Sequence, residues 1–156
     1  MIAVSNTSPL ILLDKAKHLF VLGQLFKKVI IPDEVDKEWL RPGGYVVPKW
    51  LQIMSVPSEA QNKAKELCHA IDAGEAEAIA LFSAIKANVL ILDDLNGRRK
   101  AKALGFPVVG TVGILIRAKQ KGIIPKLAPV LDTLKEYRFY IDDELLKYAL
   151  TVAEET

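Results

Sequence analysis

The sequence predicts an α/β fold: a three-layer α/β/α domain with a central, mostly parallel sheet and extra helices near the C-terminus. Short apolar segments alternate with longer helical segments, which is the pattern of repeated β-α-β units. The 156 residues correspond to about one domain, and 51% of them are hydrophobic, which is enough for a substantial core. We therefore expect a single domain over residues 1–156, with residues 122–156 as a helical extension packed on it.

The predicted strands are short and apolar, as expected for strands that are buried on both faces of a parallel sheet. The first one runs directly into the small polar residues "SNTS". This places Asn6 and Thr7 at the junction between a strand and a helix, on the edge of the sheet where ligand sites of such folds are built. The predicted strands are residues 2–4, 29–31, 51–56, 89–92 and 107–109.

The helical segments follow from apolar spacing and from residues that begin or end helices. Ser8 before Pro9 predicts an N-cap with proline at the first helical position. The stretch "RPGGYVVP", residues 41–48, predicts a loop. The predicted helices are residues 8–22 with a break near 14–17, then 33–40, 58–70, 75–87, 96–104, 111–121, 124–137 and 142–154.

Composition and motifs exclude several classes of protein. The net charge of +2 does not by itself indicate binding to a polyanion, although clustered Lys and Arg residues leave room for local patches. The single cysteine, Cys68, excludes a disulfide framework and fits a cytoplasmic location. His18 and His69 have no partner at metal-binding spacing. We expect no signal peptide and no membrane span, and no nucleotide-binding or serine-hydrolase motif is present.

The strongest local signal is "NVLILDDLNGRRKAKALG", in which a strand ends in Asp93 and Asp94 and a basic helix follows. Two carboxylates at the carboxyl end of a parallel strand lie on the ligand edge of the sheet. Because like charges repel, the pair needs a cation, an arginine or a raised pKa. The alternative is a turn with an ordinary helix cap, where aspartate is common.

A second acidic signal is "IDAGEAEAIALF", where Glu75 opens a helix and Glu77 follows two residues later. Residues two apart point about 200° away from each other around a helix, so only one of these glutamates is expected to serve a site. Ordinary placement of acidic residues in a first helical turn is the alternative. In "IPDEVDKEWL", Glu34 and Glu38 share one helix face, and we expect most acids of this segment to be solvated.

Taken together, these segments resemble the PIN-domain family of metal-dependent ribonucleases, which includes VapC-type toxins. "VSNTSPLI", "IIPDEVDKEW", "DAGEAEAIAL" and "LILDDLNGRRKAKALG" are similar to the four motifs of that family, in the same order. "GTVGILIRAKQKGIIP" and the tail resemble a prokaryotic PIN-like subfamily of poorly characterised function. The resemblance covers nearly the whole chain and implies the three-layer fold.

The resemblance also implies a set of site residues and a chemistry. It points to Asn6, Glu38, Glu75 and Asp94 as catalytic residues, and to Asn6, Glu75, Asp93 and Asp94 as ligands of Mg²⁺ or Mn²⁺. Carboxylate and amide oxygens suit these ions and need no histidine. Asn6 stands where the family usually has an aspartate, so the site carries one negative charge fewer and weakened activity is expected. Candidate RNA contacts are Thr7, Ser8, Arg98, Arg99 and Thr111.

Two functions remain open at this point. The first is a metal-dependent endoribonuclease, either a toxin with an antitoxin protein as its partner or a related enzyme. The second is a non-catalytic PIN-like module that binds RNA or protein. A phospho-acceptor receiver domain is rejected because its acid pair should follow the first strand, which here ends at Asn6. We also expect a homodimer formed through the apolar stretch "LILLDKAKHLFVLGQLF", residues 10–26.

Overall fold

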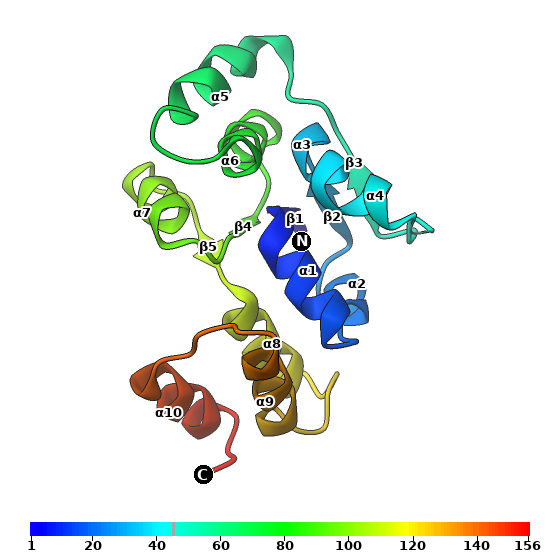
Figure 1. The fold of residues 1–156 in the computed structure, drawn as a ribbon, viewed down its shortest axis with the longest axis vertical. Coiled ribbons are helices and arrows are strands. Elements are labelled where there is room, and N and C mark those ends of the chain that lie inside the picture. The colour runs from blue at the N-terminus through cyan, green and yellow to red at the C-terminus, as the bar shows by residue number, and fades with distance from the viewer. Residues whose placement is uncertain (45) are drawn as a thin grey trace.

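A five-stranded parallel sheet forms the centre of the molecule, as the sequence predicted. The computed structural model describes residues 1–44 and 46–156, so Tyr45 of the predicted loop lies outside the described residues. The strand order is β3-β2-β1-β4-β5, and all four neighbouring pairs are parallel. The strands are β1 (Ile2–Ser5), β2 (Lys28–Ile31), β3 (Leu51–Ile53), β4 (Val89–Ile91) and β5 (Val108–Val109). Figure 1 shows the helices arranged around this sheet.

Alternate strand residues contribute to two separate cores, one on each face of the sheet. Ala3 and Ile91 belong to one apolar cluster, whereas Val4 and Leu90 belong to the other. This alternation follows from the period of two along a strand. Because helices complete both clusters, the domain has three layers, as predicted.

The first face is covered by helices from separate parts of the chain. They are α1 (Thr7–Lys15), α2 (Phe20–Leu25) and α8 (Thr111–Gln120). The segment between β2 and β3 adds α3 (Asp33–Val35), η1 (Asp36–Leu40) and α4 (Arg41–Gly43). The turn η1 is π-helical, a widened geometry that is frequent at functional sites. The predicted loop is therefore wrong at its start, because α4 continues the preceding turns.

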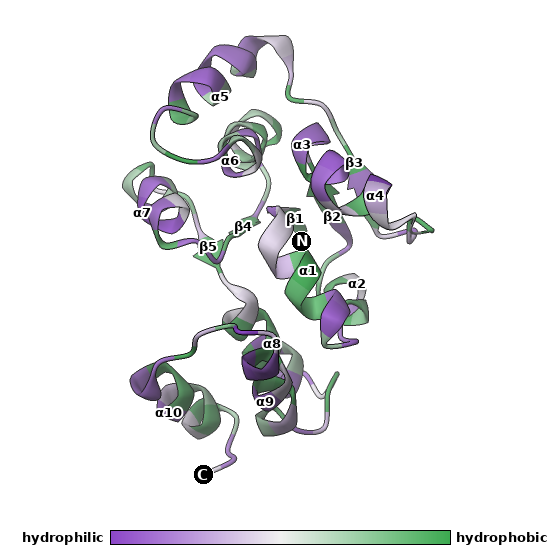
Figure 2. Ribbon diagram, viewed as in Figure 1, coloured by the Kyte–Doolittle hydropathy of each residue, from purple (hydrophilic) through white to green (hydrophobic). Residues whose placement is uncertain are grey.

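The opposite face carries the segment between β3 and β4 and the helix after β4. These elements are η2 (Ser58–Ala60), α5 (Gln61–Leu67), α6 (Ala73–Ile85) and α7 (Leu95–Ala103). Figure 2 shows α5 and α7 as mostly hydrophilic, whereas α6, which contacts both of them, is more apolar. Accordingly, α6 contributes the largest part of the second core, including Ile79 and Leu81, both fully buried.

The prediction of Ser8 as the N-cap of the first helix is wrong. Helix α1 begins at Thr7, and Asn6 is the capping residue, with an extended backbone at φ −81° and ψ 175°. The backbone N–H of Asn6 still donates to Ile91 O of the neighbouring strand, at 3.1 Å. Strand β1 therefore passes into α1 without a loop, and this fixes Asn6 at the sheet edge.

The C-terminal extension consists of α9 (Ala128–Glu136) and α10 (Asp143–Val152), packed beside α8 (Figure 1). Helix α9 starts later than predicted because the carboxylate of Glu155 accepts hydrogen bonds from the N–H groups of Leu127 and Ala128, at 2.6 and 3.0 Å. Glu155 also pairs with Lys119 on α8, at 3.2 Å. Among the described residues, no helix is long and apolar enough to cross a membrane.

Candidate functional site

The strand order places the ends of β1 and β4 at the point where the winding of the sheet reverses. From β1 the chain continues to β2 and β3 on one side, and it then crosses to β4 and β5 on the other. Ligands of open α/β sheets bind at such a switch point, beyond the carboxyl ends of the strands. Asn6 directly follows β1, and Asp93 and Asp94 follow β4 by two and three residues.

Three side-chain oxygens from separate elements gather around the backbone of Gly74. A β-carbon placed on Gly74 would stand 3.1 Å from Asn6 Oδ1, 3.5 Å from Glu38 Oε1 and 3.6 Å from Asp72 Oδ1. The absence of a side chain at Gly74 therefore leaves the space that these oxygens surround. Asn6 is only 4% exposed and forms the floor of this space, whereas Glu38 and Asp72 are exposed at its rim.

Glu38 is held in this position by Thr7. The Thr7 hydroxyl donates to Glu38 Oε2 at 2.7 Å, which ties the π-helical turn η1 to the first residue of α1. Thr7 is itself buried. The hydroxyl thus orients the carboxylate that lies next to Asn6, whereas the sequence had suggested Thr7 as an RNA contact.

Glu75 is the buried acid of the site. Only 3% of the residue is exposed, and its Oε2 atom has no hydrogen-bond partner within the described part of the chain. Burial raises the pKa of Glu75 to about 8, and the neighbouring acids Asp72 and Asp94 act in the same direction. At neutral pH this group therefore holds a proton in the metal-free protein.

Gly97 makes room for this carboxyl group. A β-carbon on Gly97 would stand 2.5 Å from Glu75 Oε2, closer than real side chains allow. Asp94 caps the same helix, α7, because its Oδ2 atom accepts a hydrogen bond from the N–H of Gly97 at 3.0 Å. The side chain of Asp94 is exposed beside Glu75, so it forms part of the rim.

Asp72 links Glu75 to the oxygens around Gly74, and no sequence motif had pointed to it. Its Oδ1 atom accepts from the N–H of Glu75 at 2.8 Å, and its own N–H donates to Glu75 Oε1 at 3.4 Å. This reciprocal arrangement is a capping box at the start of α6. The spacing D-x-x-E in "DAGE" is the signal that could have identified it.

Asp93 occupies a different environment from Asp94. Its two carboxylate oxygens accept hydrogen bonds from the N–H and the hydroxyl of Thr111, at 2.7 and 2.5 Å. Burial raises the pKa of Asp93, and the Thr111 hydrogen bonds and the Arg98 charge oppose this shift in part. Asp93 therefore joins β4 to the start of α8. Thr111 is fully buried, which leaves no surface of this residue for direct contact with RNA.

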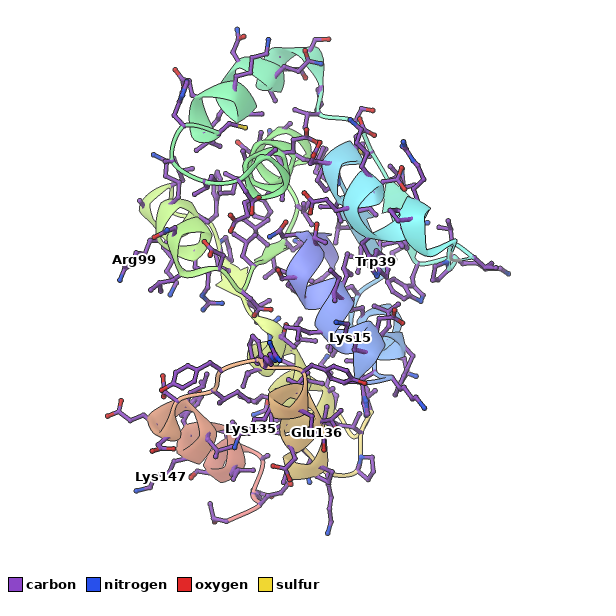
Figure 3. All side chains as sticks on the ribbon, viewed as in Figure 1. Lys15, Trp39, Arg99, Lys135, Glu136 and Lys147 are labelled. Atoms are coloured by element: carbon purple, nitrogen blue, oxygen red, sulfur yellow. The ribbon has the colours of Figure 1, made fainter. Side chains whose placement is uncertain are left out.

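The remaining predicted RNA contacts lie in different places. Ser8 is exposed in a shallow groove of about 390 Å³ that Lys15, Asp94 and Arg138 also line. The Arg98 guanidinium donates to Leu92 O at 3.0 Å, so it is partly committed to the protein. Arg99 lies on the outer side of α7 (Figure 3) and lines a separate groove.

Other polar groups singled out in the sequence stand apart from this centre. Glu77 points to the far side of α6, where its Oε1 atom accepts from the N–H of Glu34 at 3.2 Å. It lines a separate pocket of about 370 Å³ together with the exposed Cys68. His18 contacts the carbonyl of Ala16 at 2.6 Å, and His69 is exposed.

The donor set fits a hard divalent cation in its chemistry. Amide, hydroxyl and carboxylate oxygens are ligands that Mg²⁺ and Mn²⁺ prefer, and Glu75 Oε2 is a buried oxygen without a partner among the described residues. In residues 1–44 and 46–156, however, no three Asp, Glu, His or Cys side chains are grouped tightly enough to enclose an ion. The acids instead form two overlapping groups, one around Gly74 and one around Glu75.

Comparison with known proteins yields one family. The model of the family DUF3368, described as a PIN domain, matches residues 2–155. A search among curated proteins returns no significant match. The matched range includes all strands and both groups of acidic residues.

Proposed function

Since the chain belongs to the DUF3368 family of PIN domains, as its sequence motifs predicted, we propose that it is a metal-dependent endoribonuclease with Asn6, Glu38, Glu75 and Asp94 as its catalytic residues. One observation carries this proposal. Polar side chains from four separate elements lie together at the switch point of the sheet, around two glycines whose missing side chains leave space for them. Such a gathering of acids is costly for folding alone, because each carboxylate repels the others.

The proposed chemistry is hydrolysis of a phosphodiester bond in RNA. A divalent ion bound at this edge would supply an activated water and relieve the negative charge on the phosphate. The chain places the ligands: Thr7 orients Glu38, Asp94 is fixed by the first turn of α7, and Glu75 is held in the buried position. Glu75 must release its proton before it can ligate a cation, so the reaction should weaken at acidic pH.

The neutral amide of Asn6 supports weak activity in this proposal. It offers a dipole instead of a charge to a cation at the end of β1. The basic residues Lys15 and Arg138 line the groove that contains Ser8 and Asp94, and they are available to neutralise RNA phosphates beside the acids. The proposed substrate is therefore a single strand that lies in this groove and passes the acidic centre.

The biological setting of the proposal is a cytoplasmic toxin that is held inactive by an antitoxin protein. We also propose a homodimer through residues 10–26. In this segment Leu10, Leu13 and Leu22 are fully buried within the chain, whereas Phe20 is 45% exposed. Phe20 is therefore the apolar side chain on which such an interface would depend. Sedimentation over a range of concentrations tests the dimer, and a monomer at every concentration would refute it.

The test of the enzymatic proposal is cleavage of a fluorescently labelled single-stranded RNA with Mg²⁺ or Mn²⁺. We expect slow cleavage by the unchanged protein, and we expect none with EDTA, in Glu75→Gln or in Asp94→Asn. Asp142→Asn is the matched control because Asp142 also caps a helix, accepting from the N–H of Leu145 at 2.7 Å, but does so on α10. Equal cleavage by all four proteins would indicate a contaminating nuclease and would contradict the proposal.

A second candidate function is a non-catalytic module that binds RNA or protein. The specific observation in its favour is that no three metal-ligating side chains enclose an ion site in the described residues. Binding of the labelled RNA without cleavage, unaffected by EDTA and by Glu75→Gln, would favour this function. Cleavage that depends on Glu75 would exclude it.

A further inference from the structure

Asp72 is the acidic residue of the centre that none of the sequence motifs explained. The residue is exposed, and yet its Oδ1 atom lies in the same space beside Gly74 as Asn6 Oδ1 and Glu38 Oε1. Of these three oxygens, the amide of Asn6 carries no charge. A divalent cation in this space would therefore depend on the carboxylates of Glu38 and Asp72 for its charge balance.

The position of Asp72 is fixed by the fold. The N–H of Glu75 donates to it in the first turn of α6, so the carboxylate is ordered without any ligand. An ordered carboxylate loses little conformational entropy when it binds a cation. Asp72 is also a neighbour of Glu75, and Asp94 is another acidic neighbour of the same residue.

A second observation concerns Glu75, which is hydrogen-bonded to Asp72 and whose Oε2 atom lies beside Gly97. Only 3% of Glu75 is exposed, and its Oε2 atom lacks a hydrogen-bond partner in the part of the chain that the structure describes. Nearly all buried polar atoms in proteins have a partner, and a bound ion is one partner that an oxygen without a protein donor can take. The capping box accounts for Oδ1 of Asp72 and Oε1 of Glu75, and it leaves Oε2 of Glu75 without a hydrogen-bond partner among the described residues.

We infer that Asp72 is a metal ligand that supplies, from the start of α6, the negative charge that Asn6 does not supply at the end of β1. This inference rests on the proposed function and deepens it. The ligand is Mg²⁺ or Mn²⁺, the cations that suit such an oxygen donor set. Asn6 and Asp72 face the same space around Gly74, so a carboxylate at either position would place its charge there.

The decisive experiment measures Mn²⁺ binding to the full chain by calorimetry, without RNA. Asp72→Asn keeps a residue type that caps helices well but removes the charge, so the fold should survive. We expect Mn²⁺ affinity to fall about tenfold or more in Asp72→Asn. Asp142→Asn, which makes the same change at the cap of α10, should leave Mn²⁺ affinity unchanged.

A double variant tests the exchange of charge directly. Asn6→Asp combined with Asp72→Asn has the same total charge as the unchanged protein, but its carboxylate is at position 6 instead of position 72. We expect it to recover most of the Mn²⁺ affinity that Asp72→Asn loses. Failure of this rescue would show that Asp72 does not act through its charge at this site, and it would overturn the inference.

Failure of the inference and failure of the proposed function give different results. If the unchanged protein and Asp72→Asn bind Mn²⁺ equally, Asp72 is only a capping residue, and the proposed nuclease site stands without it. If the unchanged protein binds no Mn²⁺ at millimolar concentration, the proposed function is overturned together with the inference. Circular dichroism melting of each variant verifies that a loss of binding does not come from unfolding.

Discussion

Two acids at the same end of the sheet, the half-buried Asp93 and the buried Glu75, have opposite surroundings. Asp93 and Glu75 both have a pKa that burial raises. Both oxygens of Asp93 accept hydrogen bonds from Thr111, and the Arg98 cation is close by. Glu75 has an oxygen without a partner in the described residues, and its charged neighbours are other acids.

The difference separates a structural acid from a candidate functional one. Burial alone does not identify a site, because the fold needs Asp93 to attach α8 to the end of β4. The Oε2 atom of Glu75 makes no hydrogen bond within the described residues that would connect two elements of the fold. Its surroundings are unfavourable for a charge, because the group is desolvated and lies close to the acids Asp72 and Asp94. A titratable group in such unfavourable surroundings is a frequent mark of a functional site.

The largest expected effect is at the structural acid. Asp93→Ala leaves the buried N–H and hydroxyl of Thr111 without their acceptor, so we expect a loss of about 3 kcal/mol in the free energy of unfolding. Urea denaturation measures this loss. Asp94→Ala is the neighbouring control and removes an exposed helix cap, which should cost about 1 kcal/mol. Equal losses in the two variants would remove the distinction between the two aspartates.

The second effect concerns pH. The pKa of Glu75 rises from 4.5 to about 8 on folding, so its contribution to stability is fully present below pH 4.5 and is lost as the pH rises through 8. In EDTA we expect the free energy of unfolding to fall between about pH 5 and pH 9, with a share on the order of 2 kcal/mol due to Glu75. Glu75→Gln should remove this share, while Asp93, whose pKa is also raised, keeps its own. An unchanged pH slope in Glu75→Gln would contradict the assignment.

The third and smallest effect concerns Asn6. Asn6→Asp adds a charged oxygen beside Glu38 and Asp72, so Mn²⁺ affinity should increase about tenfold, which equals about 1.4 kcal/mol. The metal-free protein should become less stable because the new carboxylate meets other acids. Mn²⁺-dependent RNA cleavage should increase in the same variant and disappear again when Asp94→Asn is added. If calorimetry finds the same Mn²⁺ affinity with and without the change, Asn6 does not face a metal.

Much of the fold was predictable because the signals are local. Short apolar strands that alternate with helices determine a parallel sheet, and the PIN motifs determine its family. The start of α1 was predicted wrongly because the pairing of Asn6 with Ile91 is a contact between distant segments. The start of α9 was predicted wrongly for the same reason, since Glu155 caps it from the end of the chain.

The residues of the candidate site could be predicted from the sequence, but the different roles of the individual acids could not. Asn6, Glu38, Glu75 and Asp94 were identified from short motifs, and the structure places them at one edge, whereas their catalytic roles stay predictions. The choice between Asp93 and Asp94 depends on where Thr111 lies, and no local pattern around the two aspartates contains that information. Asp72 was overlooked although its capping-box spacing was visible in the sequence.

The most direct test of the acidic centre is the number of protons released when Mn²⁺ binds at neutral pH. Because burial holds Glu75 protonated in the metal-free protein, a cation that it ligates must displace about one proton per ion bound. Calorimetric titrations in two buffers with different ionisation enthalpies measure this number. We predict about one proton for the unchanged protein and close to none for Glu75→Gln. Mn²⁺ binding without proton release, or equal release in both proteins, would contradict a metal centre built around Glu75.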